Sequence, residues 1–157
     1  MRFDQSIKIW GCFGYNNTGR QEIFDEVINS KKYIEVLSNK MLPSVEMLGL
    51  NLSDFIFQDD SAPIHRSRIV NKWKNDNNIE SLEWCGNSPD LNPIENLWKI
   101  LKLKIAKYKP TNKLLLKRAI VKVWREEIPV EICRGLIESM DRRCKAVLKN
   151  KGGHTKY

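Results

Sequence analysis

Asp54-Phe55-Ile56-Phe57-Gln58-Asp59-Asp60 is the stretch that decides the fold. Its first part, residues 54–57, is too short for a helix and too apolar for a loop, so it predicts a buried strand. Acidic residues directly after a buried strand can reach a metal ion without being buried themselves. Taken alone, Asp59 and Asp60 are explained equally well by an Asp-rich turn.

The chain before this stretch predicts a hairpin and then a helix. Residues 6–13 alternate with the period of a strand, residues 14–19 turn the chain, and residues 21–24 give a second, antiparallel strand. Ser30 is expected to cap the following helix and Pro43 to loosen its end. The buried face of that helix is expected to hold Tyr33, Val36, Leu37 and Met41.

The chain after this stretch predicts mostly helices. One is expected to follow Pro63 and to end near Asn75, and residues 79–84 form one more short strand. Asn92 is then expected to cap a helix that has Pro93 at its first position. Two further helices are expected around residues 114–124 and 132–147.

Glu95 is the second acidic candidate. It lies one turn into the helix that follows Pro93, where its side chain can point off the apolar face toward the sheet edge that carries Asp60. Ordinary helix-start chemistry also explains it, because Asn92 and Glu95 have capping-box spacing and Glu95 can pair with Lys99. The sequence leaves both readings open.

Length and composition indicate one soluble domain. The chain has 157 residues, of which 41% are hydrophobic and 29% charged, which fits a globular protein with one core. No apolar run approaches the ~18 residues of a membrane span, and the first residues are unlike a signal or transit peptide. We therefore expect a soluble intracellular protein that does not bind membranes.

The cysteines predict neither a zinc site nor a disulfide framework. The sequence has four cysteines without a Cys-x-x-Cys pair, and only two histidines, so zinc-ligand spacing is absent. We expect the thiols to be reduced and buried. The four are Cys12, Cys85, Cys133 and Cys144.

Basic residues dominate the segment after Glu95, and the whole chain has a formal net charge of +8. A solvated helix face is one reading of this segment. A track for the phosphates of double-stranded DNA is favoured, because so many like charges repel one another unless a polyanion neutralises them. The segment contains Lys99, Lys102, Lys104, Lys107, Lys109, Lys113, Lys117, Arg118, Lys122 and Arg125.

Aromatic side chains lie among these basic residues. Trp98, Tyr108 and Trp124 could stack on bases, but the two tryptophans occupy helix positions typical of a core. His65 is more typical of a helix-start hydrogen-bonding residue than of a catalytic base.

Four segments together resemble the catalytic domain of Tc/mariner superfamily DDE transposases. They are Trp-Gly-Cys-Phe at residues 10–13, Phe-Gln-Asp-Asp-Ser-Ala-Pro-Ile-His at 57–65, Ser-Pro-Asp-Leu-Asn-Pro-Ile-Glu-Asn-Leu-Trp at 88–98 and Lys-Gly-Gly-His-Thr-Lys-Tyr at 151–157. The third is highly specific, and the four occur in the family's order over nearly the whole chain.

The resemblance implies a ribonuclease-H-like α/β fold, with a mixed sheet flanked by helices, and a Mg²⁺ (or Mn²⁺) site. In the family, thirty-four residues separate the second catalytic aspartate from the glutamate, and Asp60 and Glu95 have this spacing (95 − 60 − 1 = 34). Asp60 and Glu95 would therefore be the catalytic, metal-binding residues, and Asp59 would occupy a position that is usually glutamine. Ser61 replaces the family's common asparagine.

The chemistry implied is two-metal cleavage and strand transfer of transposon ends and target DNA. The resemblance also implies that the protein can form a homo-oligomer and, if its source is a eukaryote, that it is located in the nucleus. Hard carboxylate oxygens are the ligands that Mg²⁺ prefers.

The resemblance departs from the family pattern at the N-terminus. Only nine residues precede Trp10, so the strand bearing the family's first catalytic aspartate, and its helix-turn-helix region, are expected to be missing from residues 1–157. A single incomplete catalytic domain is expected, whose sheet has unpaired inner edges and which cleaves DNA poorly alone. The alternative function is a non-catalytic DNA-binding remnant or a domesticated interaction protein.

Overall fold

The computed structural model describes residues 7–53, 55–60, 62–82 and 89–152. These residues form two compact units. The α/β unit contains residues 7–12 and 19–82 of the described chain, and the helical unit contains residues 13–18 and 89–152. Asp54, Ser61 and the predicted strand residues 83 and 84 lie outside the described residues.

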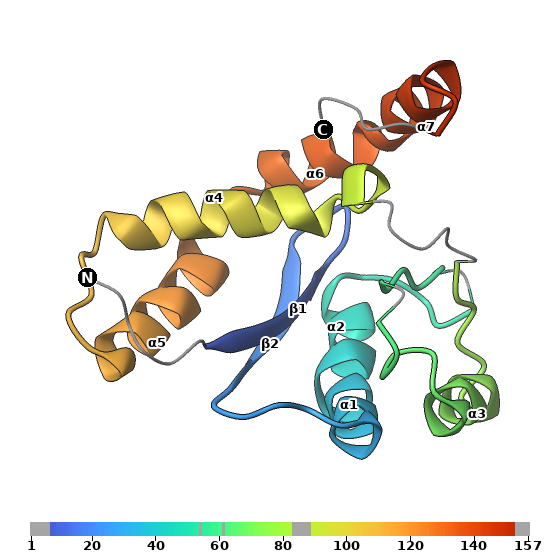
Figure 1. The fold of residues 1–157 in the computed structure, drawn as a ribbon, viewed down its shortest axis with the longest axis horizontal. Coiled ribbons are helices and arrows are strands. Elements are labelled where there is room, and N and C mark those ends of the chain that lie inside the picture. Colours follow the sequence, from blue (N-terminus) through green and yellow to red (C-terminus); the bar gives the residue numbers. More distant parts are fainter. Residues whose placement is uncertain (1–6, 54, 61, 83–88, 153–157) are drawn as a thin grey trace. The chain divides into compact units, whose positions relative to one another are not determined.

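The predicted hairpin is present. Strands β1 (Lys8–Phe13) and β2 (Thr18–Phe24) pair in a two-stranded antiparallel sheet (Figure 1), and the amide of Gly14 donates to the carbonyl of Asn17 across the turn. The tip belongs to the helical unit because its contacts are made there. The Thr18 hydroxyl donates to the carbonyl of Trp124 at 3.1 Å.

One long helical run follows the hairpin and differs from the prediction at both ends. It contains α1 (Ser30–Val36), the π-helical turn η1 (Leu37–Met41) and α2 (Leu42–Met47). The cap is Asn29, whose side chain accepts from the amide of Lys32, rather than Ser30. Pro43 does not loosen the end, because it lies in the first turn of α2, where its missing N–H is tolerated.

Among the described residues of the strands predicted at 54–57 and 79–84, the pairing is a single parallel bridge between Phe57 and Ser81. Phe57 donates to the carbonyl of Glu80 at 2.7 Å and accepts from the amide of Leu82 at 2.8 Å. The first strand was also expected to be buried, which is wrong at Ile56: this side chain is 57% exposed, whereas Phe57 is 8% exposed. Only one face of this segment meets the helices, so burial alternates along it.

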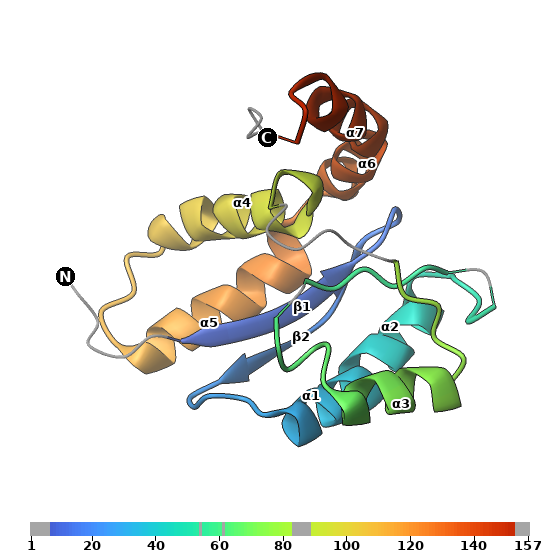
Figure 2. The same ribbon diagram turned by 45° about the vertical axis from the view of Figure 1, so that its right-hand side comes forward.

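Helices α1, α2 and α3 (Arg68–Asp76) form the helical layer of the α/β unit (Figure 2). All four residues predicted for the first helix's buried face are at most 3% exposed, which confirms that face. Trp10 of β1 and Trp73 of α3 pack against the same core, so the hairpin and the Phe57 segment share one layer of helices. The buried core cluster contains Tyr33, Leu37, Met41, Val45, Phe57, Val70 and Ile79.

The helical unit consists of the 3₁₀ turn η2 (Pro89–Leu91), α4 (Ile94–Ala106), α5 (Lys113–Lys122), the π-helical turn η3 (Val123–Glu127), α6 (Val130–Glu138) and α7 (Met140–Lys149). The helix predicted around residues 132–147 is therefore two helices, which meet at Ser139. Helix α4 contacts α5, η3 and α6, and α6 contacts α7 (Figure 1).

The N-terminus of α4 corrects one prediction. The N-cap is Pro93 with helical dihedral angles (φ −66°, ψ −19°) and no side-chain cap hydrogen bond, so Asn92 does not cap the helix. The chain instead enters α4 through η2, and the amide of Glu95 donates to the carbonyl of Asn92 at 3.2 Å.

The described cysteines are free, but they are not all buried. Cys133 is buried, Cys12 is half-buried and Cys144 is exposed, so the expectation of burial is wrong for Cys144. Cys85 lies outside the described residues. Burial raises the pKa of both Cys12 and Cys133 to about 11, which keeps these thiols protonated at neutral pH. No helix of the described residues is long and apolar enough to cross a membrane.

Candidate metal centre and nucleic-acid interface

The adjacent carboxylates Asp59 and Asp60 have opposite environments. The side chain of Asp59 is 16% exposed, and its Oδ2 accepts from the Tyr33 hydroxyl at 3.0 Å and from Lys74 Nζ at 2.6 Å. The side chain of Asp60 is 56% exposed. Successive side chains of an extended segment point to opposite sides. Asp59 therefore lies on the side of the buried Phe57, and Asp60 lies on the opposite, exposed side.

Asp60 is held by its own local turn. Its Oδ1 lies 2.5 Å from His65 Nδ1 and accepts from the amide of Ala62 at 2.9 Å. The close contact with His65 lowers the pKa of Asp60, with the Ala62 amide acting in the same direction against partial burial. The Asp60 carboxylate is therefore ionised at neutral pH.

Tyr33 connects the two carboxylates. Its hydroxyl donates to Asp59, and its ring stacks on His65 with ring centroids 4.1 Å apart and an interplanar angle of 25°. Burial, and then the charge of Asp59, raise the pKa of Tyr33, so it stays a neutral donor. A side chain of α1 thus supports both acidic positions, and the hydrogen bonds of Phe57 fix the segment that carries them.

Glu95 lies in the first turn of α4, exposed and opposite the buried residues Leu97 and Leu101. The expectation that it points off the apolar face is confirmed, and Pro93 rather than Asn92 is the N-cap. Asp60 belongs to the α/β unit and Glu95 to the helical unit, so each half of the predicted site is described in its own unit.

All ten predicted DNA-binding residues lie in the helical unit. Lys104, Lys113 and Lys117 are half-buried, and the other seven are exposed: Lys99, Lys102, Lys107, Lys109, Arg118, Lys122 and Arg125. On α4, Glu95, Lys99 and Lys102 follow one another at i, i+4 and i+7 and form one exposed stripe. The catalytic candidate and the first two lysines therefore share a helix face.

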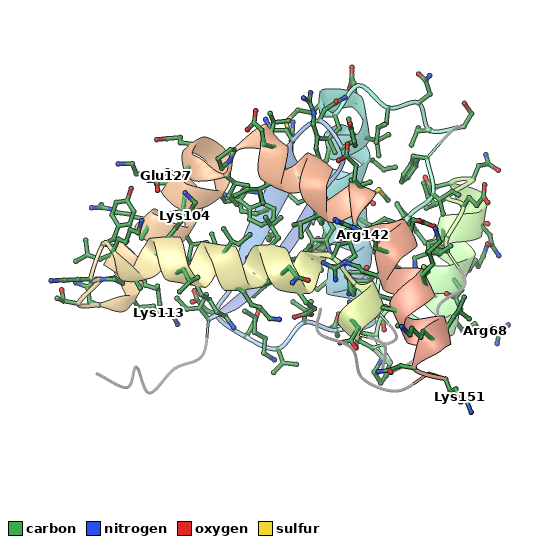
Figure 3. The ribbon with its side chains drawn as sticks, turned by 90° about the horizontal axis from the view of Figure 1, so that it is seen from above. Arg68, Lys104, Lys113, Glu127, Arg142 and Lys151 are labelled. Atoms are coloured by element: carbon green, nitrogen blue, oxygen red, sulfur yellow. The ribbon has the colours of Figure 1, made fainter. Side chains whose placement is uncertain are left out.

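The end of α4 is fixed to η3 by an aromatic side chain. The Tyr108 hydroxyl donates to Glu127, and Lys122 Nζ lies 5.3 Å from the centroid of the Tyr108 ring. Figure 3 shows Lys104, Lys113 and Glu127 at the end of the helical unit where α4 passes into α5. The Tyr108 ring is already covered by Lys122 on one side, although 41% of the residue is exposed.

The two tryptophans pack inside the helical unit. Trp98 and Trp124 stack with ring centroids 5.1 Å apart, and Trp124 is 1% exposed. Trp124 therefore occupies a core position, and the half-buried Trp98 packs on it, which confirms that the two rings pack against each other.

The side-chain chemistry of Asp60 and Glu95 suits a hard divalent cation. Asp60 presents an ionised, exposed carboxylate, and Glu95 presents a second exposed carboxyl side chain. Within the described part of the chain, no three His, Cys, Asp or Glu side chains are grouped so that they could hold a metal ion.

Sequence reasoning missed the supporting residues Tyr33 and Lys74. Tyr33 was predicted only as a core residue, and its hydroxyl has no sequence signal. Lys74 lies four residues after Val70, on the buried face of α3, and is itself 5% exposed. A lysine at the spacing of a buried helix face is the one signal that could have identified it.

Solved structures define the class of fold. The Mos1 transposase catalytic domain, solved with raltegravir and Mn, superposes with a TM-score of 0.87 at 18% identity, over 99% of this chain and 80% of that one. The Mos1 mariner paired end complex with Mn gives a TM-score of 0.88 at 19% identity, over 99% of this chain and 47% of that one. These matches confirm the α/β, ribonuclease-H-like fold class.

Residues 3–114 match the family described as DDE superfamily endonuclease. The chain belongs to this family and, within it, to the Tc/mariner transposase catalytic domains. It is 35% identical to the Tcb1 transposase of Caenorhabditis briggsae and 32% identical to the Tc1 transposase of Caenorhabditis elegans. Each alignment covers 97% of this chain and 55% of the relative, so the chain spans about half the length of these relatives.

Proposed function

We propose that this chain supplies Asp60 and Glu95 as ligands for Mg²⁺ or Mn²⁺ in an endonuclease that cleaves and joins double-stranded DNA at transposon ends and target sites. The observation that carries the proposal is the environment of Asp60: of two adjacent carboxylates, it is the one that is exposed and not paired with a lysine. The relatives named above are transposases, and we propose the same activity for this chain.

The roles of the residues follow from their chemistry. Divalent ions, when bound, would activate the attacking oxygen and stabilise the leaving oxygen. Asp60 would bind through hard carboxylate oxygens, while His65 and the Ala62 amide hold its Oδ1. Glu95 would contribute the second carboxylate from the first turn of α4.

DNA would approach along the exposed stripe of α4. Lys99 and Lys102 lie one and two turns beyond Glu95 on the same helix face, so phosphates bound there would lead toward the carboxylate. The other basic residues of α4 and α5 extend the positive surface. Complexes of the structural relatives, described as paired end and strand transfer complexes, support DNA binding and self-association as proposals for this chain. We also propose that the protein acts in the nucleus.

Nicking of supercoiled plasmid by the full chain with Mg²⁺ or Mn²⁺ tests the proposal, and it is expected to be slow because the chain should cleave DNA poorly alone. Glu95→Gln and Asp60→Asn should each abolish divalent-ion-dependent nicking. The matched control is Glu131→Gln, because Glu131 is an exposed glutamate in the first turn of α6, in the same unit as Glu95. Nicking that survives both active-site changes would contradict the proposal, and DNA binding without any nicking would favour the non-catalytic alternative.

A further inference from the structure

The surroundings of Lys74 point to a role for a residue that lies outside the proposed ligands. Lys74 is on the buried face of α3, its side chain is 7% exposed, and its Nζ is 2.6 Å from Asp59 Oδ2. The Phe57 ring lies below the ammonium group, with its centroid 5.3 Å from Nζ. A buried ammonium group is stable only with a partner, so Lys74 and Asp59 hold one another.

We infer that Lys74 determines which of the two adjacent carboxylates can bind a metal ion: it holds Asp59 in a buried ion pair, so that Asp60 is the carboxylate available to the metal. This inference rests on the proposed role of Asp60. The ammonium group and the Tyr33 hydroxyl both bind Asp59 Oδ2, and a metal ion at this carboxylate would have to compete with both. Lys74 is thus a positioning residue that touches neither the metal ion nor the DNA.

The pair also sets the local charge. Lys74 neutralises Asp59. Of the two adjacent aspartates, Asp60 is therefore the one whose charge is not compensated by a lysine. Without Lys74, the charge of Asp59 would be uncompensated, and its carboxylate could turn toward an approaching cation in place of Asp60. Lys74 therefore limits the ligands on this segment to one.

Mn²⁺ binding to the full chain, measured by the electron paramagnetic resonance signal of free Mn²⁺, tests the inference. Asp60→Asn should weaken binding by at least about tenfold. Adding Lys74→Gln to that variant should release Asp59 as a substitute ligand and restore binding to within about threefold of the unmodified chain. The matched control adds Lys72→Gln instead, because Lys72 is on the same helix, 73% exposed, and pairs with Asp76 rather than Asp59. This control should stay as weak as Asp60→Asn alone.

The outcomes separate the inference from the proposed function. If Asp60→Asn binds Mn²⁺ as well as the unmodified chain, the assignment of Asp60 fails. If it loses binding, and the folded Lys74→Gln double variant binds no better than the Lys72→Gln control, the inference about Lys74 is overturned. If circular dichroism shows that the Lys74→Gln variant does not fold, Mn²⁺ binding is measured instead on Asp59→Asn, which keeps Lys74. Binding within about threefold of the unmodified chain supports the inference, and a loss as large as that of Asp60→Asn overturns it.

Discussion

Asp60 and Asp59 are neighbours in sequence with different physical roles. Asp59 is a structural carboxylate whose charge is matched by Lys74, whereas Asp60 is exposed and held by His65 and a backbone amide. The alternation of side chains predicts that only one of the two can face solvent. Which one does so is decided by Tyr33 and Lys74, which come from α1 and α3 and are distant in sequence.

The lowered pKa of Asp60 predicts a pH dependence of stability. A carboxyl group whose pKa is lower in the folded chain stabilises it above the unfolded pKa, and this contribution is lost as the pH falls through the folded pKa. In a ¹³C carboxyl titration of the folded chain, Asp60 should titrate below the ordinary value of about 3.9. His65→Gln should move that midpoint upward. A midpoint for Asp60 at or above the ordinary value would show that the His65 contact does not form.

Adding a single methyl group at Gly19 of β2 should lower the stability of the fold. A Cβ at this position would lie 2.6 Å from Cys12 Sγ and 2.8 Å from the Cβ of Ser44, so β2 or α2 would have to move. Gly19→Ala should lower the free energy of unfolding by about 1–3 kcal/mol in urea denaturation. The control is Gly135→Ala in α6, where a Cβ meets nothing within 4 Å. It should raise stability by about 0.5–1 kcal/mol, and equal effects at both glycines would contradict the close approach.

At the scale of elements, the sequence predicts most helices and the hairpin but misplaces their ends. The apolar face of residues 33–41 is confirmed, because periodicity reports burial directly. The effect of Pro43 is not predictable from its identity alone, since the preceding π-helical turn η1 lets the helix continue through it. Similarly, the start of α4 depends on the 3₁₀ turn η2, which the sequence pattern does not distinguish from an Asn92 cap.

The turn that leads to Glu95 is held by a buried arginine. Arg143 of α7 is 2% exposed, and its guanidinium donates to the Asp90 carbonyl at 2.8 Å and to the Ser139 hydroxyl at 2.7 Å. Arg143→Met would leave both acceptors without these donors, and should lower the free energy of unfolding by about 1–3 kcal/mol.

The adjacent residue provides the control for Arg143. Arg142, labelled in Figure 3, is exposed, so Arg142→Met should change stability by less than about 0.5 kcal/mol, as measured by the same denaturation experiment. A similar loss in both variants would show that general charge, rather than the contact with η2, is responsible.

At the scale of the whole molecule, the positive charge is concentrated on one part of the chain. Ten of the chain's 27 Lys and Arg residues lie between Glu95 and Glu126, in the helical unit. The sequence predicted this segment, but not which of its side chains are half-buried, because that depends on how α4 and α5 pack. The sheet was the least predictable part, since strand pairing depends on contacts distant in sequence.

If the basic residues follow DNA phosphates, affinity for duplex DNA should fall steeply with salt, because each neutralised phosphate releases about 0.9 of a counterion. Lys102→Glu, Lys109→Glu and Lys113→Glu together should weaken binding to all DNA sequences alike and reduce the salt slope. Fluorescence anisotropy at several salt concentrations measures both. An affinity that does not change between low and moderate salt would contradict the proposed DNA track.

The central proposal is that Asp60 and Glu95 are ligands of the same divalent cation, and site-directed oxidative cleavage tests it most directly. Fe²⁺ bound in place of Mg²⁺ generates hydroxyl radicals with ascorbate and peroxide, which cut the polypeptide beside the bound ion. The account predicts cuts next to both Asp60 and Glu95, suppressed by excess Mg²⁺ and lost together in Asp60→Asn. Cuts at only one of these positions, or cuts near Glu95 that persist in Asp60→Asn, would contradict the claim.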